Sequence, residues 1–111
     1  MPFEPGRIIL VSFPFTDHTS AKLRPALVVS GSAFNAAEDF VAVPISGQLD
    51  ADGYQILSTD PYFKTTQLRG DSTVRWMKPM TISSKVVVRR LGTIPPEVLT
   101  QIQAHIRSFF S

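Results

Sequence analysis

Four side chains between residues 18 and 75 could act together on a phosphate group: Arg24, Ser46, Arg75 and His18. Arginine presents a planar, permanently charged fork that can contact two phosphate oxygens at once, and serine adds a short hydroxyl donor. Such groups bind a phosphodiester and stabilise the charge that grows on its oxygens. His18, beside Asp17 in a polar loop, is the titratable group near neutral pH that lies closest to Arg24 in sequence, although a solvated loop histidine is the commoner situation.

RNA is the nucleic acid on which this set could do chemistry. Its 2′-hydroxyl can act as the nucleophile, so the protein needs neither a serine or cysteine nucleophile nor a metal ion. The protein must instead orient that hydroxyl in line, neutralise the developing charge and move protons. DNA lacks the hydroxyl, so the same site would bind DNA without cutting it by this route.

The chain lacks the residues that thiol, metal-dependent and serine-nucleophile chemistry would need. The chain has no cysteine, which excludes disulfides, zinc fingers and thiol catalysis. It has no glycine-rich phosphate loop and no serine in a nucleophile elbow. With two distant histidines and scattered carboxylates, we expect no metal site and no cofactor. Asp50 and Asp52 in "LDADG" lack the rest of a calcium loop and indicate a turn.

Length and charge favour one small domain with a basic surface. The 111 residues, 43% of them apolar, predict a single domain over residues 1–111. The apolar runs are too short to span a membrane, and the first residues lack a signal peptide, so we expect a cytoplasmic protein. The net charge is only +2, but residues 69–90 hold six of the eleven Lys and Arg residues. This stretch is equally consistent with a phosphate-binding surface and with a solvated sheet face. Its basic residues are Arg69, Arg75, Lys78, Lys85, Arg89 and Arg90.

Short β-rich segments and one clear helix predict a mainly β (α+β) fold, a bent antiparallel sheet or partly open barrel. We expect Pro25 to begin its strand and to hold Arg24 in an extended conformation. His105 shares the helical spacing of Ile102 and Phe109, and we interpret it as structural. The expected strands are 7–13, 25–30, 41–46, 54–58, 72–82 (broken or bulged at Pro79) and 84–94, and the expected helix is 96–109.

Five segments in this order resemble the MazF/PemK family, the toxins of bacterial toxin–antitoxin pairs: "GRIILVSFPFTD", "RPALVVS", "AFN", "VAVPIS" and "TISSKVVVRRLG". The resemblance runs from about Gly6 to the final helix. It implies an SH3-like partly open barrel related to the toxin CcdB, assembled as a homodimer. It also implies a metal-independent endoribonuclease that cuts single-stranded RNA such as mRNA at short sequences, leaving 2′,3′-cyclic phosphate and 5′-hydroxyl ends. The implied partners are RNA, a cognate antitoxin whose flexible tail covers the RNA groove, and operator DNA through the antitoxin complex.

The resemblance carries roles to individual residues. Arg24 matches the catalytic arginine, and Ser46 stands where the family usually has threonine. Arg75 and His18 match a strand arginine and a loop histidine of the PemK branch. That branch has an aspartate two residues after the strand arginine, whereas this chain has Met77. Because arginine is a poor base at neutral pH, we assign Arg24 to phosphate binding and transition-state stabilisation and His18 to acid–base chemistry.

The expected RNA-binding residues are Arg75, Trp76, Lys78, Phe15 and Arg69. Phe15, Trp76 and Tyr62 could stack on unpaired bases, although ordinary packing explains Phe15 and Tyr62 equally well. The alternative function is a non-catalytic binding module on the same barrel, either a gyrase-directed poison or an inactive member that binds RNA or DNA. The gyrase poison has a C-terminal end with tryptophan, whereas this chain ends "RSFFS". The presence of both Arg24 and Ser46 favours cleavage.

Overall fold

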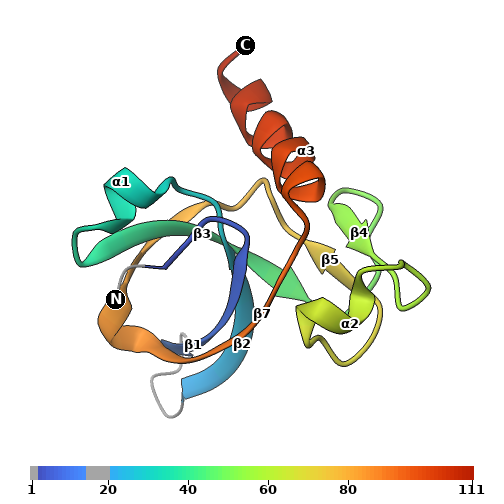
Figure 1. Cartoon of the computed structure of the whole chain (residues 1–111), viewed down its shortest axis with the longest axis horizontal. Coiled ribbons are helices and arrows are strands. Elements are labelled where there is room, and N and C mark those ends of the chain that lie inside the picture. Colours follow the sequence, from blue (N-terminus) through green and yellow to red (C-terminus); the bar gives the residue numbers. More distant parts are fainter. Residues whose placement is uncertain (1–2, 15–20) are drawn as a thin grey trace.

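The structure is a computed structural model that describes residues 3–14 and 21–111, and its main feature is a bent antiparallel sheet (Figure 1). The described residues are mainly β with a C-terminal helix, as expected from the sequence, and they form seven strands where six were expected. The strands are β1 (Arg7–Pro14), β2 (Ala21–Val28), β3 (Asp39–Ser46), β4 (Tyr54–Ile56), β5 (Ser72–Val74), β6 (Met80–Ser83) and β7 (Val87–Thr93). The helices are α1 (Ser32–Asn35), α2 (Phe63–Thr66) and α3 (Pro96–Arg107), with 3₁₀ turns at Ser84–Val86 and Ser108–Phe110.

β3 is the strand from which the sheet branches. The strand order is β4-β5-β3-β2-β1-β7, and β6 also pairs with β3. β5 joins β3 at Ile45 and Ser46, whereas β6 joins it at Asp39–Ala42, on the side away from β2. The strand expected at 72–82 is therefore two strands. The five residues 75–79 between them face only two residues of β3, so the predicted break lies at this bulge.

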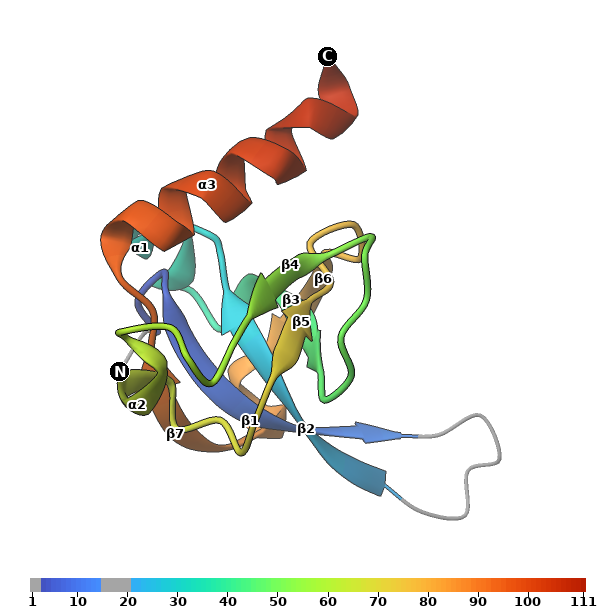
Figure 2. The same ribbon diagram turned by 90° about the vertical axis from the view of Figure 1, so that its right-hand side faces the viewer.

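The two faces of the sheet bury separate cores. Successive residues of a strand point to opposite faces, so Leu27 joins one core while Ala26 and Val28 join the other. The first core lies under α3, which contributes Val98 and Ile102. Figure 2 shows α3 lying across one side of the strands. The second core is lined by Phe3, Ile9, Val11, Ala26, Val28, Phe40, Ala42 and Ile82.

The terminal helix begins where the sequence predicts and ends slightly earlier. Pro95 precedes the first turn and Pro96 stands inside it, where a missing N–H costs little. The helix ends at Arg107, and a 3₁₀ turn follows instead of the predicted continuation to Phe109. No described helix is long and apolar enough to cross a membrane.

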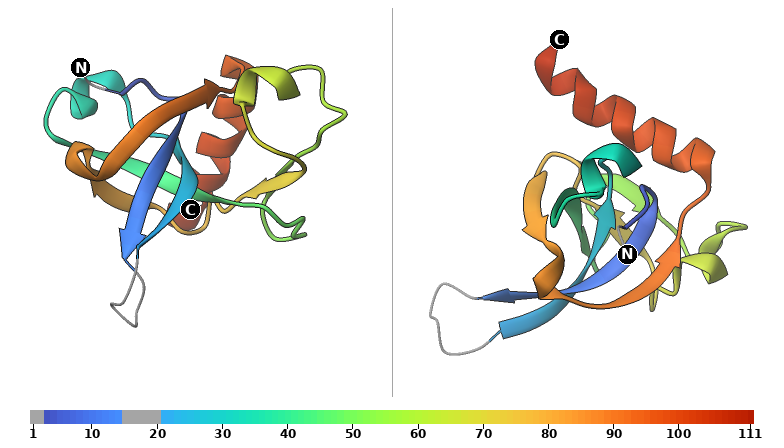
Figure 3. Two further views of the ribbon diagram at one scale, coloured as in Figure 1. Left: turned by 90° about the horizontal axis from the view of Figure 1, so that it is seen from below. Right: turned by 60° about the vertical axis from the view of Figure 1, so that its left-hand side comes forward.

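β2 begins earlier than expected, and Pro25 lies inside it rather than at its start. The strand pairs with β1 from Ala21 onwards, with Pro25 opposite Leu10. The ladder to β3 starts only at Ala26. Pro25 thus belongs to a stretch that pairs with β1 alone, and a proline is tolerated where one side of a strand is an edge. The paired ends of β1 and β2 project from the body of the sheet (Figures 2 and 3).

Candidate nucleic-acid interface

Arg24 lies on the projecting part of β2, opposite Val11 of β1. Its side chain is exposed. Strand alternation puts Arg24 on the face of Ala26 and Val28, while Leu23 and Pro25 point to the opposite face. The extended geometry expected for Arg24 is confirmed, but it comes from pairing with β1 as well as from the proline that follows.

Ser46 shares the face of Arg24. The last pair between β2 and β3 is Ala26 with Pro44. Two residues further along each strand, beyond this last pair, strand alternation puts Arg24 and Ser46 on the same side of the sheet as Ala26 and Pro44. Ser46 is half-buried at the end of β3, where its Oγ accepts a hydrogen bond from the Gln48 N–H at 3.3 Å. The pairing of the sheet therefore brings the two predicted catalytic residues to one face.

Arg75 joins this face from the third strand. Its N–H donates to the Pro44 carbonyl at 2.9 Å, directly after the β3–β5 pair of Ile45 and Val74. Since Val74 and Ile45 both point into the first core, Arg75 points to the other side, as Ser46 does. Residues from β2, β3 and the end of β5 thus place two guanidinium groups and a hydroxyl on one surface, which we call the phosphate face: Arg24, Ser46 and Arg75.

Asp50 is a residue of this face that the sequence did not reveal. Its Oδ2 forms an ion pair with Nη1 of Arg75. The hydrogen bond from Arg75 lowers the pKa of the Asp50 carboxyl, with smaller contributions from the Asp52 backbone and the charges of Arg75 and Lys78. Lys78, exposed and expected to bind RNA, therefore lies within electrostatic reach of this pair. The turn predicted at residues 50–53 is present and also carries this counter-ion.

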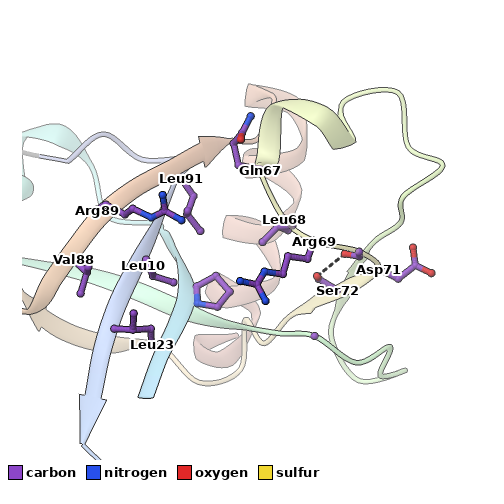
Figure 4. A pocket seen from close by; sticks show the side chains of 13 residues that line it. Leu10, Leu23, Gln67, Leu68, Arg69, Asp71, Ser72, Val88, Arg89 and Leu91 are labelled. Carbon is purple, nitrogen blue, oxygen red and sulfur yellow. Dashed lines mark hydrogen bonds between the residues drawn. The ribbon is translucent and has the colours of Figure 1, made fainter. Parts of the chain in front are cut away.

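The opposite face of β2 borders a groove of about 980 Å³. Apolar side chains from β1, β2, β7 and residue 68 form much of its wall: Leu10, Leu23, Pro25, Leu68, Val88 and Leu91. Figure 4 shows Arg69 pointing from the segment before β5 toward β1 and β2, with Arg89 on the β7 side. Arg69, expected to bind RNA, is thus separated from Arg24 by the strand itself.

Two of the three aromatic residues proposed to stack on bases, Trp76 and Tyr62, lie against the protein. Trp76 stacks on His105 of α3, with ring centroids 5.0 Å apart and planes 20° from parallel, and lies 5.4 Å from Phe109. It points to the first core, away from Arg75. His105 thus has a packing contact on the helix surface. Tyr62 packs on the same core, and burial raises the pKa of its hydroxyl.

Two expected site residues, His18 and Phe15, lie outside the described residues. Within residues 3–14 and 21–111, no three His, Asp or Glu side chains gather in a way that could hold a metal ion. The described part of the site therefore consists of cations, a hydroxyl and one paired carboxylate, a set suited to binding an anion.

Comparison with known proteins gives the family. Residues 4–110 match the family model of the PemK-like, MazF-like toxin of type II toxin–antitoxin systems. No curated protein sequence gives a significant match.

Several solved structures share the fold. A MazE–MazF complex from Deinococcus radiodurans is similar with a TM-score of 0.76 and 18% identity, covering 99% of this chain and 97% of the other. An endoribonuclease in complex with its cognate antitoxin from a Mycobacterial species gives a TM-score of 0.73 at 19% identity, over 98% and 93%. The Mycobacterium tuberculosis toxin MazF-mt6 gives 0.68 at 14%, over 92% and 95%. At such identities the likeness is one of fold.

Proposed function

Because the chain belongs to the PemK-like, MazF-like toxin family, we propose that it is the toxin of a toxin–antitoxin pair and a metal-independent endoribonuclease. Its substrate is single-stranded RNA, including mRNA, in the cytoplasm. The observation that supports the proposal is that strand pairing and alternation put the side chains of Arg24, Ser46 and Arg75 on one side of the sheet.

The proposed reaction is an internal transfer of the phosphate. The substrate's 2′-oxygen forms a bond to phosphorus, the bond to the 5′-oxygen breaks, and the products are a 2′,3′-cyclic phosphate and a 5′-hydroxyl. One proton leaves the 2′-hydroxyl and one reaches the departing oxygen. His18 is the proposed group for proton transfer, since its ordinary pKa lies near neutrality.

The phosphate face supplies the charge that this reaction needs. As the phosphorus gains a fifth oxygen, negative charge grows on the non-bridging oxygens. Arg24 would bind two of these oxygens from the paired part of β2, and Ser46 would donate its hydroxyl from the end of β3. Fixed donors of this kind need little rearrangement during the reaction, which is why they lower its barrier.

The test is cleavage of a long, weakly structured RNA by the purified protein in EDTA. We expect defined cuts with cyclic phosphate ends, and an oligonucleotide with a single 2′-deoxy substitution at the cut site should bind but remain intact. Activity that disappears in EDTA and returns with magnesium would overturn the proposed mechanism. RNA that stays whole in every buffer would favour the non-catalytic alternative.

The groove behind β2 suits a protein partner better than a phosphate chain. Its wall is largely apolar and Arg69 and Arg89 lie beside it, so a segment with apolar side chains and carboxylates would complement it. Two of the structures with this fold are complexes with an antitoxin. We therefore assign the groove to part of the cognate antitoxin, in addition to the flexible tail expected over the RNA-binding face. Through this antitoxin the toxin would also meet operator DNA.

This assignment predicts that Arg69→Glu weakens capture of the co-expressed antitoxin without changing RNA cleavage. We also expect the toxin itself to be a homodimer, with the segment 65–70 and α3 contributing surface. If Arg69→Glu instead converted a dimer to a monomer in light scattering, the groove would be the contact between toxin copies.

A further inference from the structure

The segment between β3 and β4 is fastened to β5 by a buried threonine. Thr73 is fully buried, and its Oγ1 donates to the Gln48 carbonyl at 2.6 Å and accepts from the Asp50 N–H at 2.9 Å. Gly53 packs so closely on β5 that a Cβ there would lie 2.2 Å from Thr73 Cγ2 and 2.7 Å from the Val74 carbonyl oxygen. The backbone of Asp50 therefore has a fixed place relative to β5.

This anchoring presents the Asp50 carboxylate to Arg75, two residues beyond Thr73 on the same strand face. The ion pair uses Nη1 of Arg75. A guanidinium has five N–H donors, so one nitrogen can hold a carboxylate while the remaining donors meet a second anion. An arginine side chain has several rotatable bonds, and a fixed partner restricts its conformations before the ligand binds. Less side-chain conformational entropy is then lost on binding.

We propose that Asp50 is a positioning residue, which holds the Arg75 guanidinium on the phosphate face beside Ser46 and Arg24 so that it meets the RNA phosphate already oriented. This inference rests on the proposed ribonuclease function. The position two residues after Arg75 is Met77, so no carboxylate is available there. Asp50 provides one from a different segment, and its contact with Arg75 depends on the fold rather than on neighbouring positions in the sequence.

The same carboxylate has a second effect that makes the proposal testable. Its negative charge lies on a cationic surface and weakens the general attraction of RNA. Removing the charge should therefore leave RNA affinity unchanged or tighter, while the loss of orientation slows the reaction. A misplaced group of this kind costs on the order of 10-fold to 100-fold in rate.

The experiment compares Asp50→Asn, Asp50→Glu and Asp52→Asn with the wild-type protein. Asp52 is exposed in the same turn, so Asp52→Asn removes an equal charge without touching the ion pair. Single-turnover cleavage of a short RNA across a mapped cut site gives the rate, and the oligonucleotide with 2′-deoxy at that site gives the affinity. We expect Asp50→Asn to cut at least about tenfold more slowly with no loss of affinity, Asp50→Glu to recover most of the rate, and Asp52→Asn to match wild type.

Three results would overturn the positioning role. A faster Asp50→Asn variant would mean that Asp50 competes with RNA for Arg75. An equal loss of rate in Asp52→Asn would reduce the effect to general charge. A wild-type rate in Asp50→Asn would leave the ion pair without a catalytic effect.

A measurement on the free protein separates this inference from the proposed function. The Nη1–H signals of Arg75, the nitrogen that contacts Asp50, should exchange slowly in the wild type and in Asp50→Glu and rapidly in Asp50→Asn. The dispersion of the backbone amide resonances in the same samples reports whether each variant is folded. A wild-type protein that fails to cut RNA would refute the proposed function directly. An unchanged Arg75 resonance in Asp50→Asn would refute the positioning role independently of activity.

Discussion

Replacing Arg24 with alanine tests the phosphate face most directly. The side chain is exposed and belongs to neither core, so the free energy of unfolding should change by no more than about 1 kcal/mol. Cleavage should fall by a factor on the order of 10² to 10³, the usual loss when one fixed donor to a developing negative charge is removed. This factor corresponds to about 2.7–4 kcal/mol of transition-state stabilisation.

The effect on affinity should be much smaller than the effect on rate. Arg24 would contribute one phosphate contact, so its loss should reduce the slope of log affinity against log salt by about 0.7 for a single-stranded ligand. Arg24→Lys should restore charge and affinity but only part of the rate, because an ammonium group cannot contact two oxygens as a planar fork does.

Single-turnover cleavage of a short RNA, with binding of its 2′-deoxy counterpart, measures both quantities. Lys85→Ala is the matched control, since it removes one positive charge from an exposed side chain whose ion pair with Glu38, at 3.2 Å, is worth at most about 1 kcal/mol. A folded Arg24→Ala protein that cuts at the wild-type rate would refute the assignment. So would Lys85→Ala if it lost as much rate as Arg24→Ala.

Three further predictions concern neighbouring features. Ser46→Ala should slow single-turnover cleavage by about tenfold or more, while Ser46→Thr should retain the rate because it keeps the hydroxyl. Gly92→Ala should lower the urea midpoint by the equivalent of about 1–3 kcal/mol, since its Cβ would lie 2.1 Å from the Thr65 carbonyl oxygen. Folding lowers the pKa of Asp50, so wild type should have a larger free energy of unfolding than Asp50→Asn at pH values above the ordinary pKa of 3.8. This difference should disappear as the pH falls through the pKa of the folded state, and urea titrations at several pH values can follow it.

The hydrophobic pattern located the strands whose residues face a core on both sides, and it placed the start of β2 at Pro25, four residues too late. Residues from Ala26 to Val29 are all buried, so the apolar run is conspicuous. The stretch Lys22–Arg24 is exposed and charged although it continues the ladder with β1. Hydrophobic pattern reports burial, whereas this hairpin arm is held by backbone pairing, which pattern cannot detect.

Sequence reasoning named the candidate residues that their immediate neighbours mark, and it did not name the candidate that only the fold brings to Arg75. Arg24 and Ser46 are conspicuous in the sequence because Arg24 directly precedes an apolar stretch and Ser46 directly follows one. Asp50 lies 25 residues from Arg75 and has the sequence context of an ordinary turn residue. It contacts Arg75 because Thr73 holds the turn against β5 by hydrogen bonds. Trp76, expected on the RNA, packs on α3 because it follows Arg75 by one position and so faces the other side of the strand.

The register of β3 decides whether the phosphate face exists. Val43 and Ile45 are buried in the first core, and Ala42 is buried in the second. A slip of one residue against β2 would turn Ser46 to the groove side and separate it from Arg24, but it would also move Val43 and Ile45 out of their core. The free energy of burying these apolar side chains therefore fixes the position of the polar ones. A serine at the end of one strand can be placed on the same face as an arginine of the neighbouring strand without any direct attraction between the two.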